Sequence, residues 1–408
     1  MIYTAILGHG TVGSGVAEIL INHNKLVSEK IRDSISVKYI LELRDFSSLP
    51  YGDKFTKDFE TIVGDADIKI VAEVMGGIHP AYEFVKRCLE AGKSVVTSNK
   101  ELVAQKGAEL LAIASKNNVN FLFEASVGGG IPILRPMAQC LAANDINSVT
   151  GILNGTTNYI LNKMIVDGMD FDAALSLAQE KGFAERDPAA DIDGHDACRK
   201  ICILASLAFG KHVYPNQVKT EGICKVTLDD VAYAEKFNCA IKLIARAQKQ
   251  PDGKISAQVA PTLVSRDNIL SNVNGVFNAI TVNGDATGDV MFYGRGAGKM
   301  PTASAVVADI IDCAKHLHAR KYFDWQDGYE GYVVNDTSKK SFYVLIKSSD
   351  YTSLCESFDT VFKGNTQNIK NECAGEIAFI TEQDYEEEIN KKLDMLKYEN
   401  IKVMNTLF

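Results

Sequence analysis

The segment IYTAILGHGTVG (residues 2–13) decides how the rest of the chain is organised. Its first six residues form an apolar run typical of a buried strand, and Gly8, Gly10 and Gly13 follow with the spacing GxGxxG. A helical pattern begins at once after these glycines. Such glycines permit a tight turn and let backbone N–H groups approach a pyrophosphate at the start of a helix. We therefore predict a dinucleotide-binding turn, with a glycine-rich turn that holds no ligand as the alternative.

Strands alternate with helices from this segment to about residue 130. Apolar runs near residues 37–41, 68–74, 94–97 and 120–126 are separated by helical patterns, as in a parallel sheet covered by helices. This pattern predicts a Rossmann-type α/β dinucleotide-binding domain. We expect residues 1–130 to form it, together with a helix at about 300–320 that follows the glycine-rich segment YGRGAGK.

The remaining chain has a different texture. Residues 131–300 mix helices with strand-like segments such as ISAQVAPTLV and AITVNG, which predicts an α+β domain for substrate binding and dimerisation. Residues 335–408 show the order strand, helix, strand, strand, helix, strand, so we predict a C-terminal βαββαβ unit there.

Composition makes several classes of protein less favoured. The 408 residues suffice for two or three domains, and the net charge of −9 disfavours nucleic acid or an acidic membrane as a partner. The longest apolar run, residues 201–209, is far shorter than the ~20 residues that span a bilayer. Nine scattered cysteines without a CxxC pair indicate reduced thiols. With no basic, leader-like start, the chain is expected to be cytoplasmic.

The end of the second strand bears on the choice of dinucleotide. Glu42, Arg44 and Asp45 lie there, and an acid at this point commonly holds the ribose 2′-OH of NAD, whereas an arginine suits the 2′-phosphate of NADP. Both residue types are present, so NAD and NADP stay open, with Arg44 favouring NADP.

A second decisive stretch is AERDPAADIDGHDACRK (residues 184–200), which places five acids ahead of an apolar run. It could be a solvated loop, a metal-binding loop or an active site. With Gly194 at the sixth position of a calcium loop, Ala189 would take the first position and Lys200 the twelfth. Neither can be a ligand there, so the calcium interpretation is excluded.

The solvated-loop alternative has a simple form. Asp193 would cap a helix, Asp196 would complete a capping box, and Asp196 with Lys200 would be an exposed pair contributing about 0.2–0.5 kcal/mol. However, the same helical stripe continues through Ile203 and Leu207, which belong to a core-like run. The pair is therefore predicted to line a cleft, where burial and a neighbouring acid can tune a lysine for proton transfer.

Longer strings extend this interpretation through a resemblance. AQEKGFAERDPAADIDGHDACRK (residues 178–200) is similar to the signature segment of homoserine dehydrogenases. Other family-like segments occur in order: ILGHGTVG, AEVMGG, TSNK, EASVGGGIPI, GILNGTTNYIL and GRGAGKMPTASAVVADI. The resemblance covers roughly residues 1–320. It implies NAD(P)-dependent interconversion of L-homoserine and L-aspartate 4-semialdehyde in threonine, methionine and isoleucine biosynthesis, by a homodimer or homotetramer.

The resemblance also implies roles for individual residues. Lys200 would protonate the aldehyde oxygen, Asp196 would hold the substrate and orient that lysine, and Lys100 would be a second cation near the reacting oxygen. The implied substrate-binding residues are Glu185, Thr156 and Asp191. The implied cofactor-binding residues are Gly8, Gly10, Thr11, Val12, Gly13, Arg44, Lys100 and Gly298.

A bound cation and a regulatory role are further implications. Members of the family resemble sodium binders at EASVGGGIPI, here through Glu124, Val127, Gly129 and Ile131, although a hinge between domains explains this segment equally well. The C-terminal extension would be of the ACT type. Its loop KSSDYTSL lacks the usual Pro-Gly, so threonine sensing and a purely oligomerising role both stay open.

Two alternatives to this function are another Rossmann reductase acting on an acidic aldehyde and a cofactor-binding sensor without catalysis. The long match over residues 178–200 argues against the first alternative. The presence of Lys100, Asp196 and Lys200 argues against the second.

Overall fold

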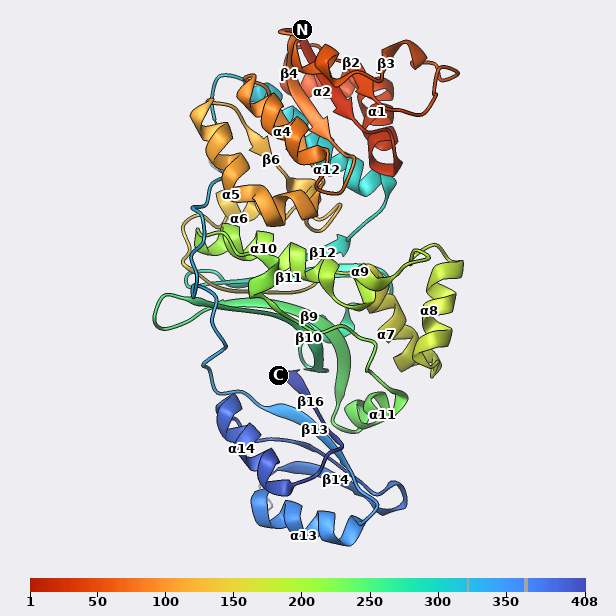
Figure 1. Ribbon diagram of the computed structural model, residues 1–408, viewed down its shortest axis with the longest axis vertical. Coiled ribbons are helices and arrows are strands. Elements are labelled where there is room, and N and C mark those ends of the chain that lie inside the picture. The colour runs from red at the N-terminus through yellow and green to blue at the C-terminus, as the bar shows by residue number, and fades with distance from the viewer. Residues whose placement is uncertain (321–322, 363–365) are drawn as a thin grey trace.

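The chain is built from three units stacked along its long axis (Figure 1). The computed structural model describes residues 1–320, 323–362 and 366–408. The N-terminal unit has its own parallel sheet. The middle and C-terminal units share one larger, mixed sheet.

The sheet of the N-terminal unit has six strands in the order β3-β2-β1-β4-β5-β6, and every neighbouring pair is parallel. This order confirms the Rossmann-type prediction. The central strand β1 is mostly apolar and buried, as expected for a strand that lies between two parallel neighbours in a sheet covered by helices. The strands are β1 (Ile2–Leu7), β2 (Ile35–Leu41), β3 (Phe55–Thr56), β4 (Ile68–Glu73), β5 (Ser94–Thr97) and β6 (Phe121–Leu122).

One helix of this unit comes from a distant part of the chain. Helix α12 (Lys299–Lys315) packs against α1, β4 and β5, and Lys299 Nζ lies 2.8 Å from a carboxylate oxygen of Glu18 on α1 (Figure 1). The other helices are α1 (Thr11–Asn22), α2 (Asn24–Ile31), α3 (Phe59–Val63), α4 (Ala81–Glu90) and α5 (Lys100–Lys116).

The larger sheet has ten strands and begins in the middle unit. Its path is β12-β11-β7-β9-β10-β16-β13-β15-β14, with β8 paired to β10. Helices α7 and α10 pack against strands of this sheet. The middle unit contains α6 (Leu134–Gln139), β7 (Ile146–Ile152), α7 (Gly155–Asp167), α8 (Phe171–Glu180), α9 (Ala189–Ile192), α10 (His195–Phe209), β8 (Lys219–Thr220), α11 (Leu228–Lys236), β9 (Cys239–Lys249), β10 (Ile255–Ser265), β11 (Phe277–Gly284) and β12 (Gly288–Arg295).

The C-terminal unit has the predicted element order βαββαβ. It has its own apolar core, which includes Phe342, Phe358 and Phe379, but it is not structurally separate from the middle unit. Strand β16 pairs in parallel with β10, so the two units share one sheet. The elements are β13 (Phe342–Lys347), α13 (Tyr351–Phe362), β14 (Gln367–Asn371), β15 (Glu376–Ile380), α14 (Glu386–Leu396) and β16 (Ile401–Leu407).

The structure differs from the sequence prediction in several local details. The strand expected at residues 120–126 is only β6, because a 3₁₀ turn, η2 (Glu124–Ser126), follows it directly. The segment PILRPMAQCLAA (residues 132–143), whose pattern predicts a single helix, is helical only over α6. Strand β9, which pairs with both β7 and β10, was not predicted.

Two findings concern the environment of the chain. All nine cysteines fall within the described residues and are free thiols. Among the helices described within residues 1–320, 323–362 and 366–408, none is long and apolar enough to cross a membrane.

The glycine-rich turn after β1 provides a matched pair of substitutions. A Cβ at Gly13 would lie 2.0 Å from the carbonyl oxygen of Gly8, whereas a Cβ at Gly10 would meet no atom within 4 Å. Gly13→Ala is therefore expected to lower stability by about 2 kcal/mol or more, through overpacking. Gly10→Ala should keep the fold but weaken dinucleotide binding. Chemical denaturation and cofactor titration measure the two effects, and equal loss of stability in both variants would contradict this account.

Candidate active site

The candidate site lies where the starts of three helices meet. Helix α5 begins at Lys100 directly after β5, and Asn99 caps it. Helix α7 begins after β7, and the Asn154 side chain caps it by accepting from Thr157 N. Helix α10 begins after the short α9 and packs against α5. The N-terminal and middle units therefore contribute side chains to one place.

The carboxylate of Asp196, in the first turn of α10, is the centre of this site. It is 3% exposed, and its Oδ2 accepts from Lys200 Nζ at 2.7 Å and from Asn154 Nδ2 at 2.9 Å. Its Oδ1 forms an ion pair with Lys100 Nζ of the N-terminal unit. Lys200 Nζ also donates to the Leu153 carbonyl oxygen at 2.7 Å. A single buried carboxylate thus holds two ammonium groups from two units.

This geometry decides between the loop interpretations. Asp196 and Lys200 are both buried, so the solvated-loop alternative is wrong. The predicted cap by Asp193 is also wrong, because Gly194 occupies the N-cap of α10 with φ +84° and no side chain caps the helix. A positive φ suits glycine, which can turn the chain sharply from α9 into α10.

The three charges are not equivalent. Burial alone would raise the pKa of Asp196, but the Lys200 and Lys100 ammonium groups outweigh it and hold that pKa well below its usual range. Burial lowers the pKa of Lys200, partly offset by Asp196, and the charge of Lys100 lowers it further. The pKa of Lys100 is raised, chiefly by the Asp196 charge. Lys200 is therefore the more acidic of the two lysines.

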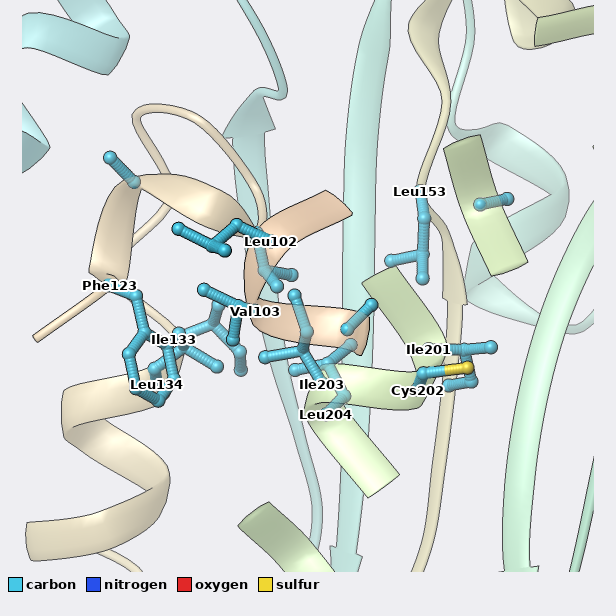
Figure 2. Close-up of a cluster of buried hydrophobic side chains, with 14 of the residues drawn as sticks. Leu102, Val103, Phe123, Ile133, Leu134, Leu153, Ile201, Cys202, Ile203 and Leu204 are labelled. Atoms are coloured by element: carbon cyan, nitrogen blue, oxygen red, sulfur yellow. The ribbon is translucent and has the colours of Figure 1, made fainter. Parts of the chain in front are cut away.

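Apolar packing holds the two lysine-bearing helices together. Figure 2 shows Leu102 and Val103 of α5 facing Ile203 and Leu204 of α10, with Phe123, Ile133 and Leu134 beside them. All of these side chains are at most 2% exposed. Because close-packed interiors tolerate little displacement, this cluster fixes the distance between Lys100 and Asp196.

Asp191, one of the residues expected to bind the substrate, lies next to the Asp196 carboxylate because both accept from the Asn154 amide. Asn154 Nδ2 donates to Asp191 Oδ1 at 2.6 Å, and burial, followed by the Asp196 charge, raises the pKa of Asp191. Thr156, in the first turn of α7, donates to the Phe183 carbonyl oxygen at 2.6 Å. That bond draws the loop carrying the exposed Glu185 against the start of α7.

Sequence reasoning missed residues that position these groups. Asn154 joins Asp191 to Asp196 and caps α7 as well. Arg199 pairs with Glu101 at 2.8 Å, which adds a second contact between α10 and α5. The Asn-Gly pair before a helical pattern was a usable signal for the cap, but the link to Asp196 depends on tertiary contacts.

Several of the residues expected to bind the cofactor lie at the glycine-rich turn after β1. A cavity of about 370 Å³ includes Gly8, Gly10 and Arg44 in its lining. Thr11 and Val12 begin α1, and no side chain caps this helix, so its first N–H groups remain available to an anion. Gly298 occupies the N-cap position of α12, a helix that packs against α1. The turn therefore fits a dinucleotide pyrophosphate, as predicted from its glycines.

Glu42 and Arg44 are paired in the lining of this cavity. The Arg44 guanidinium lies 2.9 Å from Glu42 Oε2 and also donates to the His9 carbonyl oxygen at 3.2 Å. The Arg44 hydrogen bond is the main cause that lowers the pKa of Glu42 to about 2. The acid at the end of β2 is therefore neutralised by its own neighbour.

The candidate cation segment is a tight buried bend. Both carboxylate oxygens of Glu124 accept from the backbone N–H groups of Ile133, Leu134 and Arg135 at the start of α6. This carboxylate does not fit a metal ligand, since its lone pairs cap a helix. Among the described residues, no cluster of three or more His, Cys, Asp or Glu side chains could hold a metal ion. A cation here would depend on the backbone carbonyl oxygens of Glu124, Val127, Gly129 and Ile131, as the sequence prediction has it.

Two family models match the chain. The model described as homoserine dehydrogenase matches residues 132–311, and the model described as homoserine dehydrogenase, NAD binding domain, matches residues 8–124. The first includes the site around Asp196, and the second includes the glycine-rich turn. The match to the second indicates a nicotinamide dinucleotide as the cofactor.

Relatives named homoserine dehydrogenase are similar over most of the chain. The Synechocystis sp. protein is 46% identical over 313 residues, which cover 75% of this chain and 72% of that relative. The Bacillus subtilis protein is 41% identical over 321 residues, which cover 78% of this chain and 73% of that relative.

Solved structures agree with these matches. A homoserine dehydrogenase from Thiobacillus denitrificans has a TM-score of 0.89 and 32% identity, covering 99% of this chain and 98% of that chain. A hyperthermophilic archaeal homoserine dehydrogenase in complex with NADPH has a TM-score of 0.65 and 30% identity, covering 76% of this chain and 97% of that chain. Sequence, fold and site geometry together place the chain in the homoserine dehydrogenase family, as an oxidoreductase that acts on a CH–OH group.

Proposed function

We propose that the site around Asp196 interconverts L-homoserine and L-aspartate 4-semialdehyde, with Lys200 as the group that gives and takes the proton. The observation that carries this proposal is the pair of lysines, one from each unit, on a single buried carboxylate. Such an arrangement holds positive charge where a carbonyl oxygen gains negative charge.

The nicotinamide supplies or accepts the hydride when the cofactor is bound. Lys200 Nζ would donate a proton to the aldehyde oxygen as it becomes an alkoxide, and it would take the hydroxyl proton in the opposite direction. Asp196 keeps Lys200 in place through the 2.7 Å bond. Burial lowers the pKa of Lys200, which brings its acidity closer to the working pH.

Lys100 and the acidic loop would orient the substrate. Lys100 is 40% exposed at its side chain, so it can reach substrate while still paired with Asp196. Glu185 and Asp191 have the charge required to bind the substrate ammonium group. Thr156, at the start of α7, would contact the α-carboxylate or the α-amino group of the substrate.

The direct test is homoserine-dependent reduction of NADP and of NAD by the wild type and by Lys200→Ala. We expect turnover in the wild type and a loss of about 10²–10⁴-fold in the variant, the range typical of general acid–base catalysis. Lys225→Ala, at an exposed lysine, serves as the matched control and should keep full activity. Absence of homoserine turnover with both cofactors would contradict the proposal.

The pH dependence follows from the pKa shift of Lys200. Reduction of the aldehyde needs protonated Lys200, so its rate should fall as pH rises through a pKa below the ordinary lysine value of 10.5. Oxidation of homoserine needs the neutral amine and should rise through the same pKa. The rates of reduction and of oxidation would be measured from pH 6 to pH 11 in steps of ~0.5 pH unit. The reduction rate should fall with pH and the oxidation rate should rise. Parallel limbs in the two directions would exclude Lys200 from this role.

We further propose NADP as the preferred cofactor. Arg44 neutralises Glu42, the acid that would repel a 2′-phosphate. Lys57 lines the same cavity, so Glu42, Arg44 and Lys57 together carry one net positive charge. Excess positive charge at the adenosine end suits the additional phosphate of NADP.

Arg44→Gln tests this preference with an internal control. The KM for NADP should rise by about tenfold, corresponding to the loss of one charge-assisted hydrogen bond. The KM for NAD should change little or decrease. Glu42 would lose its guanidinium partner and keep only the backbone N–H groups of His9, Leu43 and Arg44, which leaves it better able to accept from the ribose 2′-OH. Initial rates with both cofactors on the same preparation measure the ratio, and an unchanged ratio would refute the role of Arg44.

Other features of the chain stay at the level of proposals. We assign residues 1–130 with 300–320 to the dinucleotide, 131–300 to substrate and dimerisation, and 335–408 to an ACT-like unit. A homodimer or homotetramer, threonine as a regulator and sodium at the bend around Gly129 are predictions of the family resemblance. Size-exclusion chromatography with light scattering measures the oligomeric state.

A further inference from the structure

A polar cavity lies where strands β8, β9 and β10 of the middle unit meet the segment that leads into the C-terminal unit. Its volume is about 460 Å³, and β8, β9, β10, the segment leading to β13, and the first residue of α14 contribute to its lining. None of its lining residues belongs to the site around Asp196. The charged residues of the lining are Lys219, Arg246, Asp336, Lys340 and Glu386.

Arg246 on β9 is the unusual member of this set. Its side chain is half-buried, and its Nε is fully buried without a hydrogen-bond partner. Across residues 1–320, 323–362 and 366–408, the guanidinium has no hydrogen bond or ion pair, although Asp336 attracts it electrostatically. Burial lowers the pKa of Arg246, and the Asp336 charge offsets only part of this effect.

The acids around Arg246 have other partners. Asp336 Oδ1 accepts from Gln248 Nε2 at 2.7 Å, and Lys340 Nζ lies 3.8 Å from its Oδ2. Glu386 is shared by Lys340 at 3.1 Å and Lys219 at 3.4 Å. With three cations and two carboxylates, the lining has one positive charge in excess, and Arg246 carries it.

Neutral donors and acceptors complete the lining. Gln258 lies directly opposite Arg246 on the neighbouring strand, and Gln217 and Asn335 face the same cavity. A guanidinium offers several N–H donors in one plane, which match the two oxygens of a carboxylate or a phosphate. Amides beside it can bind the remaining polar groups of such a ligand.

An unpaired, partly buried charge lowers the stability of a fold, so its retention needs a reason. We propose that this cavity binds a small oxyanion, a carboxylate or a phosphate, with Arg246 as its anchor. The ligand would contact both strands β9 and β10 of the middle unit and the segment around Asp336 that leads into the C-terminal unit. Its binding would therefore stabilise the junction between the two units.

The test uses the full-length chain and its Arg246→Met variant. Thermal unfolding and isothermal titration calorimetry are run with phosphate, acetate, succinate or chloride at constant ionic strength. In the wild type, we expect saturable stabilisation by phosphate or by a carboxylate, and none by chloride. Arg246→Met should weaken that binding by about tenfold or more, since it removes the charge-assisted hydrogen bonds. The responses to phosphate and to the carboxylates identify the kind of ligand.

Two controls distinguish binding at Arg246 from a general effect of anions on the protein surface. Arg266→Met, at an exposed arginine after β10, should bind the anion like the wild type. Without anion, Arg246→Met should be at least as stable as the wild type and equally active, because it removes an unpaired charge outside the catalytic site.

Three results would overturn the proposal. Wild type without a saturable anion response would show that the cavity binds no oxyanion. Destabilisation of Arg246→Met without anion would show that the guanidinium is already satisfied within the chain. A smaller oligomer in Arg246→Met would show that the guanidinium pairs with a second copy instead.

Discussion

The buried carboxylate of Asp196 is the interaction on which the rest of the site depends. It receives Lys200 from its own helix, Lys100 from the N-terminal unit and the Asn154 amide from the start of α7. Removing one partner of such a group would leave a buried charge uncompensated, at a cost of about 3–5 kcal/mol. The same carboxylate therefore joins the N-terminal and middle units, and it partly offsets the effect of burial on the pKa of the lysine that is proposed to move the proton.

Backbone and packing constraints place this carboxylate. Gly194 turns the chain from α9 into α10 with a positive φ, and the apolar contact between α5 and α10 brings Lys100 to within ion-pair distance of Asp196 (Figure 2). Strands β1 and β4 lie side by side at the centre of the N-terminal sheet, where the strand order reverses, which is the usual place for a dinucleotide. In the proposed function, hydride and proton transfer therefore take place at the boundary between the N-terminal and middle units.

Sequence patterns predicted the parts that depend on local periodicity. The run of residues 2–13 identified β1 and its glycine turn, and the i,i+4 stripe identified Asp196 with Lys200. Other features have no local signal. Strand β9 places Lys242 and Arg246 among apolar residues, which hides its alternation, and the parallel pairing of β10 with β16 joins segments far apart in the chain. The contacts of Asn154 and the helix-capping role of Glu124 likewise exist only in the folded chain.

The central claim is that Lys100 and Lys200 share one carboxylate, so that each influences the acidity of the other. The most direct measurement is the pH dependence of aldehyde reduction in Lys100→Met compared with the wild type. Loss of the Lys100 charge removes a repulsion that lowers the pKa of Lys200 and leaves Asp196 to pair with Lys200 alone. The account predicts that the alkaline limb moves to higher pH while overall activity falls. A limb that stays in place or moves to lower pH would contradict the claim that Lys100, held beside Lys200 by the same carboxylate, contributes to the acidity of Lys200.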